Sequence, residues 1–274
     1  MKEVLAAILA LSGFWQAPAG APTSQQQSLA ALQARAEAGD ADAQVQLGTA
    51  YATGDGVTKD DALAVKWFRK AAEKESAAGE YSLGEMYLTG RGVTGDMAEA
   101  AKWIKQAAQH GDARGQFNLA VMYAQGQGVP KNADEATAWM RKSAEAGLAA
   151  GEFGLGSMFA HGTGVPQNIA EAAKWYRKAA DQGDQPAMNN LAFLLATSSD
   201  PKIRDPKEAV TIAQKVVEMG ADEPAYLDTL ATAYFEAGRP DLAAETERRA
   251  LKLKPDSVSY KEAFSKYESA TSKH

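Results

Sequence analysis

Residues 47–72 read LGTAYATGDGVTKDDALAVKWFRKAA, and three variants of this stretch follow at intervals of 36 residues. A tryptophan and the first glycine of a Gly-x-Gly motif mark the step most clearly, at Trp67, Trp103, Trp139, Trp175, Gly54, Gly90, Gly126 and Gly162. Columns of Leu, Tyr or Phe, Ala and Val keep the same register. A repeat of this length indicates an array of small units that bury their apolar faces only by stacking.

Each unit is predicted to form two helices joined by the Gly-x-Gly turn. Residues 113–125 carry apolar side chains at helical spacings. Gly126 ends this helix, because glycine tolerates the left-handed backbone that stops it. The second helix begins at a short polar residue whose side chain accepts hydrogen bonds from free N–H groups. The expected caps are Asp60, Asp96, Asn132 and Asn168.

A further glycine closes the second helix in three units, at Gly111, Gly147 and Gly183. Glu75 stands at the equivalent position of the first unit. We expect this turn either to change shape or to hold Glu75 in a strained left-handed conformation.

The pattern L-G-x-x-Y-x-x-G-x-G-V-x-x-D…A-x-x-W-x-x-x-A-A in residues 47–72 resembles the Sel1-like repeat, a relative of the tetratricopeptide repeat. The resemblance implies an all-α fold, a right-handed α-solenoid of stacked antiparallel helix pairs. Four Sel1-like repeats are expected at residues 41–76, 77–112, 113–148 and 149–184.

The flanking segments depart from the repeat pattern. Residues 185–256 resemble two tetratricopeptide-like units, the first of which lacks the Gly-x-Gly turn. Residues 20–40 are predicted to be a linker and an N-terminal capping helix. Residues 257–274 are predicted to be a C-terminal capping helix and tail.

Residues 1–19 are predicted to be a signal peptide. Val4–Leu11 is an apolar run, and Ala17-Pro18-Ala19 supplies small residues for cleavage. The run is too short to span a bilayer, which requires about 20 apolar residues. We therefore expect a periplasmic or secreted protein with no stable membrane insertion after signal removal. An amphipathic N-terminal helix and an uncleaved anchor are the alternatives.

Composition excludes several classes of function. The 274 residues include no cysteine, which rules out disulfides, a thiol nucleophile and lipid attachment at a cysteine. A formal net charge of −6 argues against a nucleic-acid partner, because such proteins carry a basic excess.

Apparent catalytic and cofactor motifs have simpler interpretations. Residues 90–95 match G-x-G-x-x-G, but a helix and not a strand is predicted before them, so we interpret the motif as a turn. His110 and His161 lack a nearby second ligand, and His161 is interpreted as a polar helix end. No serine or threonine lies in a nucleophile-elbow context. We therefore expect no catalytic residues, metal, cofactor or small-molecule substrate.

Basic residues recur on the second helices at Arg69, Lys105, Arg141 and Arg177. They could form a ridge that binds an anionic partner. The favoured interpretation is i,i+4 ion pairing within each helix, as Arg69–Glu73, Arg141–Glu145 and Arg177–Asp181.

The first helices supply the candidate binding surface. In related solenoids these helices line the concave face. Two residues before and after each repeat leucine, the sequence places a stripe of mixed aromatic and polar residues: Tyr81, Glu85, Phe117, Val121, Phe153, Ser157, Asn189 and Phe193. Such a surface suits an extended segment or a helix, although the three aromatic residues Tyr81, Phe117 and Phe153 could instead pack between units.

The sequence therefore predicts an exported, non-enzymatic scaffold or adaptor that binds a protein partner on this face, in envelope regulation, assembly or host contact. One alternative is a cell-wall or β-lactam hydrolase. Members of the family with that role are cysteine-rich, and this chain has no cysteine. A cytosolic or host-delivered effector is the other alternative.

Overall fold

The computed structural model describes residues 24–220 and 223–271, and within these ranges its regular secondary structure is entirely helical. The helices are α1 (Ser24–Glu37), α2 (Ala41–Thr53), α3 (Asp61–Ala72), α4 (Ala77–Thr89), α5 (Met97–Gln109), α6 (Ala113–Gln125), α7 (Ala133–Glu145), α8 (Ala149–His161), α9 (Ile169–Asp181), α10 (Gln185–Thr197), α11 (Pro206–Met219), α12 (Pro224–Glu236), α13 (Pro240–Leu253) and α14 (Val258–Thr271).

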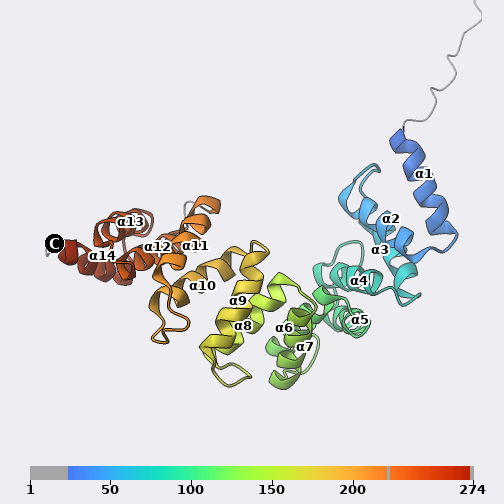
Figure 1. Ribbon diagram of the computed structural model, residues 1–274. Helices are drawn as coiled ribbons and strands as arrows, with labels where there is room; N and C mark the ends of the chain where they lie inside the picture. The colour runs from blue at the N-terminus through green and yellow to red at the C-terminus, as the bar shows by residue number, and fades with distance from the viewer. Residues whose placement is uncertain (1–23, 221–222, 272–274) are drawn as a thin grey trace, which may run out of the picture.

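The helices stack in chain order as pairs. The first helix of each pair is even-numbered, from α2 to α12, and the second is odd-numbered, from α3 to α13. Each helix packs against its neighbours in sequence, which produces an elongated, curved array with α1 and α14 at opposite ends (Figure 1). This arrangement confirms the predicted all-α solenoid.

Glycine and short polar caps set the helix boundaries, as predicted. Gly54, Gly90, Gly126 and Gly162 follow the first helices with φ of 85°, 68°, 77° and 69°. The side chains of Asp60, Asp96, Asn132 and Asn168 accept backbone N–H groups at the start of the second helices. The G-x-G-x-x-G stretch at residues 90–95 lies in the loop between α4 and α5, so it is a turn.

The turn between α3 and α4 is strained. Glu75 has φ of 60° and is the only non-glycine residue with positive φ in the described ranges. The equivalent Gly111, Gly147 and Gly183 have φ of 92°, 80° and 87°. The chain thus keeps the turn geometry and forces an L-residue into it, the second of the two predicted outcomes.

Small residues let the paired helices approach closely. The repeat leucines of the first helices are fully buried, among them Leu47, Leu83 and Leu119. A Cβ on Gly84 would lie 2.7 Å from Ile104, and a Cβ on Gly156 would lie 2.7 Å from the Tyr176 ring. The glycine that follows the leucine in three of the four repeats is therefore a contact point between the two helices of one unit.

The four repeat tryptophans are buried to different extents, although they occupy equivalent positions. Trp67 and Trp139 are 9% exposed, whereas Trp103 and Trp175 are only half-buried.

The predicted signal peptide lies outside the described residues. Within the described ranges, no helix combines the length and the apolar character that a bilayer crossing requires.

Candidate functional site on the inner face

The first helices form the inner side of the curve. Neighbouring first helices contact one another, as α2 with α4, α6 with α8 and α10 with α12. No two second helices in the described ranges contact each other to that extent. Helices that are closer together lie at the smaller radius, so the even-numbered helices line the concave surface, which we call the inner face.

The predicted stripe lies on this face. Its eight members are half-buried or exposed, while the leucine between each pair is buried: Tyr81, Glu85, Phe117, Val121, Phe153, Ser157, Asn189 and Phe193. Phe193 is 45% exposed, which makes it one of the most exposed large apolar residues in the described ranges. The structure therefore places the stripe where a partner can reach it; whether it binds one remains a prediction.

Two inter-repeat contacts order the middle of the stripe. The Arg114 guanidinium lies over the Tyr81 ring at 4.3 Å from its centroid, and Asp112 Oδ2 accepts from Arg114 Nη2 at 2.7 Å. Asn118 Nδ2 donates to Glu85 Oε1 at 2.9 Å. These contacts join α4 to α6, so the aromatic ring and the carboxylate are held in place before any partner arrives.

Burial shapes the electrostatics of this region. Desolvation raises the pKa of Glu85, and the Arg114 charge and the Asn118 hydrogen bond oppose that rise. The pKa of the Tyr81 hydroxyl is also raised, first by burial and then by the charge of Glu85. The inner face at α4 and α6 is therefore a partly dehydrated surface that can accept hydrogen bonds and apolar contacts.

Phe153 is the member of the stripe that packs most closely against the core. The Phe153 and Tyr176 rings are 5.7 Å apart, and Phe153 packs against a core cluster that extends from α9 to α12. Ser157 lies one turn before His161, whose Nδ1 is 2.9 Å from the Ser157 carbonyl oxygen. Tyr81 and Phe117 belong to no such core cluster in the described ranges. Of the three aromatic residues, Phe153 thus has the greatest share of core packing.

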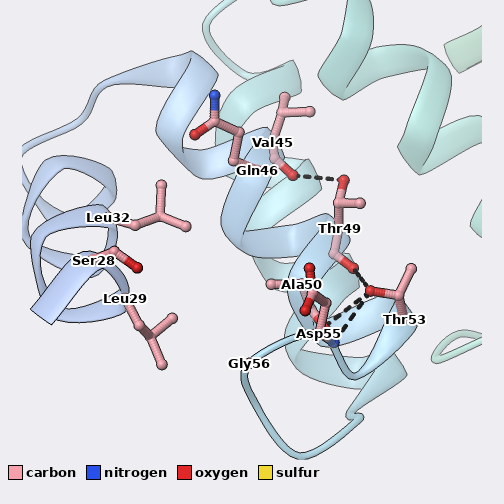
Figure 2. A pocket seen from close by; sticks show the side chains of 10 residues that line it. All are labelled: Ser28, Leu29, Leu32, Val45, Gln46, Thr49, Ala50, Thr53, Asp55 and Gly56. Carbon is pink, nitrogen blue, oxygen red and sulfur yellow. Dashed lines mark hydrogen bonds between the residues drawn. The ribbon is translucent and has the colours of Figure 1, made fainter. Parts of the chain in front are cut away.

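A pocket of about 390 Å³ marks the N-terminal end of the inner face (Figure 2). Leu29 and Leu32 of α1 and Val45 and Thr49 of α2 are among the residues that line it. The Thr49 hydroxyl donates to the Val45 carbonyl oxygen at 2.9 Å. This hydroxyl is already bonded to its own helix, but Gln46 and Asp55 also line the pocket, so it offers a partner both apolar and polar contacts.

The predicted ion pairs within the second helices are wrong. Arg69 Nη2 donates to the Tyr87 hydroxyl at 2.8 Å, and Arg141 lies over the Phe159 ring. Arg177 makes a bidentate pair with Glu208 at 2.5 and 3.0 Å. Each long side chain reaches the next unit, because stacking brings partners there closer than the i+4 carboxylate. These arginines join repeats and do not form a free basic ridge.

A buried polar position escaped the sequence prediction. Gln44, Glu80, Gln116 and Glu152 recur at one place in the first helices and are 1–8% exposed. Glu80 Oε2 is 2.8 Å from Nδ1 of His110, and Gln182 Nε2 donates to Glu152 Oε2 at 2.8 Å. The signal was a recurring Glu or Gln at the repeat period. The side-chain partners of the two glutamates lie 30 residues away, whereas Gln44 and Gln116 donate to backbone carbonyls eight residues before them.

His161 is exposed at the end of α8, as predicted. In the described ranges, no three His, Cys, Asp or Glu side chains are grouped as a metal site requires.

Two known structures have a similar architecture. The crystal structure of a protective antigen present in uropathogenic Escherichia coli strains, which displays an SLR fold, is 31% identical with a TM-score of 0.70. The match covers 84% of this chain and 49% of that one, so this chain spans about half of that protein. A Sel1 repeat protein from Oxalobacter formigenes is 26% identical with a TM-score of 0.65, over 82% of this chain and 92% of that one.

A more distant structure, the tetratricopeptide-repeat protein YrrB, shares the fold at 18% identity and a TM-score of 0.51, over 72% of this chain and 96% of that one. A comparison with curated proteins gave no match. The model of the Sel1 repeat matches residues 41–76, 77–112, 113–148, 149–184 and 185–220. The fifth match includes the unit whose turn lacks Gly-x-Gly. The chain belongs to the Sel1 repeat family.

Proposed function

We propose that this chain is an exported, non-enzymatic scaffold that captures a segment of a protein partner along its inner face. Sel1 and tetratricopeptide repeats typically serve as protein-interaction scaffolds. One observation carries the choice of face: Tyr81, Phe117 and Phe193 leave aromatic surface accessible on the first helices α4, α6 and α10, while the leucines beside them are buried. Aromatic side chains are frequent anchors of protein interfaces.

The rigid inner face supports capture of an extended or helical segment. The contacts between Arg114 and Tyr81 and between Asn118 and Glu85 fix the surface before binding, which lowers the entropy lost on association. YrrB, which shares the fold, was described as having an unusual peptide-binding site. Concave capture of a peptide is therefore compatible with this architecture.

The proposed setting is the bacterial envelope or beyond it, in regulation, assembly or host contact. Its support is the apolar run and small residues of the first 19 positions, together with the similarity to a protective antigen of uropathogenic strains. Sequencing the N-terminus of the protein recovered from cell fractions tests it. We expect a new N-terminus near residue 20 in the periplasmic or secreted fraction; an intact Met1 in the cytosol would refute export.

The binding proposal is tested by replacing the three accessible aromatic residues Tyr81, Phe117 and Phe193 with alanine and measuring partner recovery and melting temperature. The matched control replaces three exposed lysines of second helices, Lys66, Lys102 and Lys174, with alanine. We expect the aromatic triple variant to lose the partner and the lysine variant to keep it, both remaining folded. Unchanged recovery by a folded aromatic variant would refute the inner-face proposal.

The absence of catalysis is also a proposal. Purified protein is expected to give no turnover of β-lactams or peptidoglycan above a blank. Sustained turnover that survives repurification would contradict it and support the hydrolase alternative.

A further inference from the structure

An apolar cavity of about 450 Å³ lies between the third and fourth repeats. Its walls are the C-terminal half of α6, the N-terminal half of α7 and the end of α8. The apolar side chains that line it include Val121, Ala136, Met140 and Met158. Val121 also belongs to the inner-face stripe, so the cavity adjoins the surface proposed to bind a partner.

The cavity has a cause in the sequence of the third repeat. The other three repeats have glycine after the leucine, and a large second-helix side chain packs against it, as Ile104 does against Gly84. The third repeat has Ala120 instead, opposite Met140. Met140 turns toward the next unit, since a Cβ on Gly154 would lie 2.5 Å from its sulfur. The space between α6 and α7 that other repeats fill is left open.

The loop of the fourth repeat does not close the gap. In two other junctions the second turn glycine abuts the first carbonyl of the preceding second helix, as Gly128 does at Met97. Gly164 instead abuts the Thr137 hydroxyl, which donates to the Ala133 carbonyl oxygen at 2.9 Å. The Thr137 hydroxyl thus occupies the position that the loop occupies at the other two junctions, and the cavity between the third and fourth repeats remains open.

The charge of the residues that line the cavity limits which ligands can bind in it. Lys131 is the only charged residue that lines the cavity, and no carboxylate does. In the described part of the chain, Lys131 has no ion pair, and neither does Lys59 at the same position of the first repeat. An apolar pocket with one unpaired cation at its edge matches a ligand with an apolar body and a nearby negative charge. The two methionines add a surface that adapts to different apolar shapes.

We propose that this cavity receives an apolar side chain of the partner segment, and that the next residue of that segment is acidic and pairs with Lys131. The proposal rests on the function proposed above and specifies its partner. The segment would run over the inner face and insert its anchor between α6 and α8. A free fatty acid shares the same chemistry but not the peptide backbone, and it serves as the competing ligand in the test.

The probe is the peptide acetyl-Gly-Gly-Leu-Glu-Gly-Gly-amide, titrated into the full chain labelled with ¹³C at the methionine methyl groups. We expect saturable shifts of the Met140 and Met158 methyl signals. Met86 and Met122 occupy the position of Met158 in earlier repeats and are buried, so their signals serve as internal controls. No saturable shift, or an equal shift at Met86, overturns the proposal.

Two variants separate the shape from the charge. Ala124→Leu introduces the residue that the second repeat carries at the same position, Leu88, and fills the cavity. It is expected to weaken binding of the probe at least tenfold. Lys131→Glu is expected to reverse the preference between the Leu-Glu peptide and a Leu-Lys peptide, while Lys59→Glu, at the same position of the first repeat, leaves it unchanged. An unreversed preference overturns the charge assignment, and tighter binding of decanoate than of the peptide overturns the peptide assignment.

Failure of this proposal is distinguishable from failure of the proposed function. If the aromatic triple variant loses its partner but Ala124→Leu keeps it at wild-type recovery, the inner face binds and the cavity does not.

Discussion

Glu75→Gly should stabilise the protein. Glu75 is held at φ of 60° in a turn where three later repeats have glycine. A left-handed conformation costs an L-residue roughly 1–2 kcal/mol. Glycine loses about 0.5–1 kcal/mol more chain entropy on folding than other residues, which offsets part of the gain. The net stabilisation is therefore about 0.5–1 kcal/mol, or about 2 °C in melting temperature for a chain of this size.

Denaturant unfolding followed by circular dichroism measures this change. Glu75→Ala separates backbone strain from charge, because it keeps the strained φ but removes a carboxylate whose charge adds to the desolvation that raises the pKa of buried Glu80. The reverse control is Gly111→Glu. A Cβ on Gly111 meets nothing within 4 Å, so its loss of stability reports the backbone alone. If Glu75→Gly is no more stable than Glu75→Ala, the strain argument is wrong.

Three further changes test other parts of the structure. Glu247 is fully buried, and its pKa is raised to about 8, first by desolvation and then by the Asp228 charge. The stability that it contributes at low pH is therefore lost as pH rises from 4.5 to 8. The stability gain of Glu247→Gln over wild type should therefore grow across that window, by at most about 1.4 kcal/mol per pH unit; a pH-independent difference would contradict it. Gly84→Ala should destabilise the protein by about 1–3 kcal/mol, because the added Cβ meets Ile104. Ile104→Met should partly restore the stability, since Met140 stands opposite Ala120 in the third repeat. Gly95→Ala, whose Cβ would have its nearest neighbour at 3.5 Å, is the neutral control. Asn132→Ala should cost about 1 kcal/mol by removing the cap of α7, and thermal melts should show Asn132→Asp to be nearly neutral.

The fold followed from the sequence because its determinants are local and periodic. Gly126 stops one helix and Asn132 starts the next through their own backbone neighbourhoods, and both outcomes were predicted. Repetition then multiplied each local signal fourfold. The exception at Glu75 could also be predicted, because the first of the four repeats is the one that lacks glycine at this position.

The contacts of the inner face and of the repeat junctions could not be predicted in the same way. Arg177 was expected to pair with Asp181 on its own helix, yet it pairs with Glu208 in the next unit. His110, at the end of the second repeat, pairs with Glu80 in the first helix of the same repeat. These partners are about one repeat apart, where stacking geometry and not helical spacing decides which side chains meet. The cavity beside Met140 likewise depends on a rotamer that no sequence column records.

Site-specific photocrosslinking in cells determines whether a partner binds the inner face. A benzophenone amino acid is placed at Phe117 on α6, and in a separate strain at exposed Lys102 on α5. We predict that Phe117 gives a defined crosslinked protein, identified by mass spectrometry, and that Lys102 does not. Crosslinks of equal yield at both positions, or only at Lys102, would show that the partner does not bind the inner face.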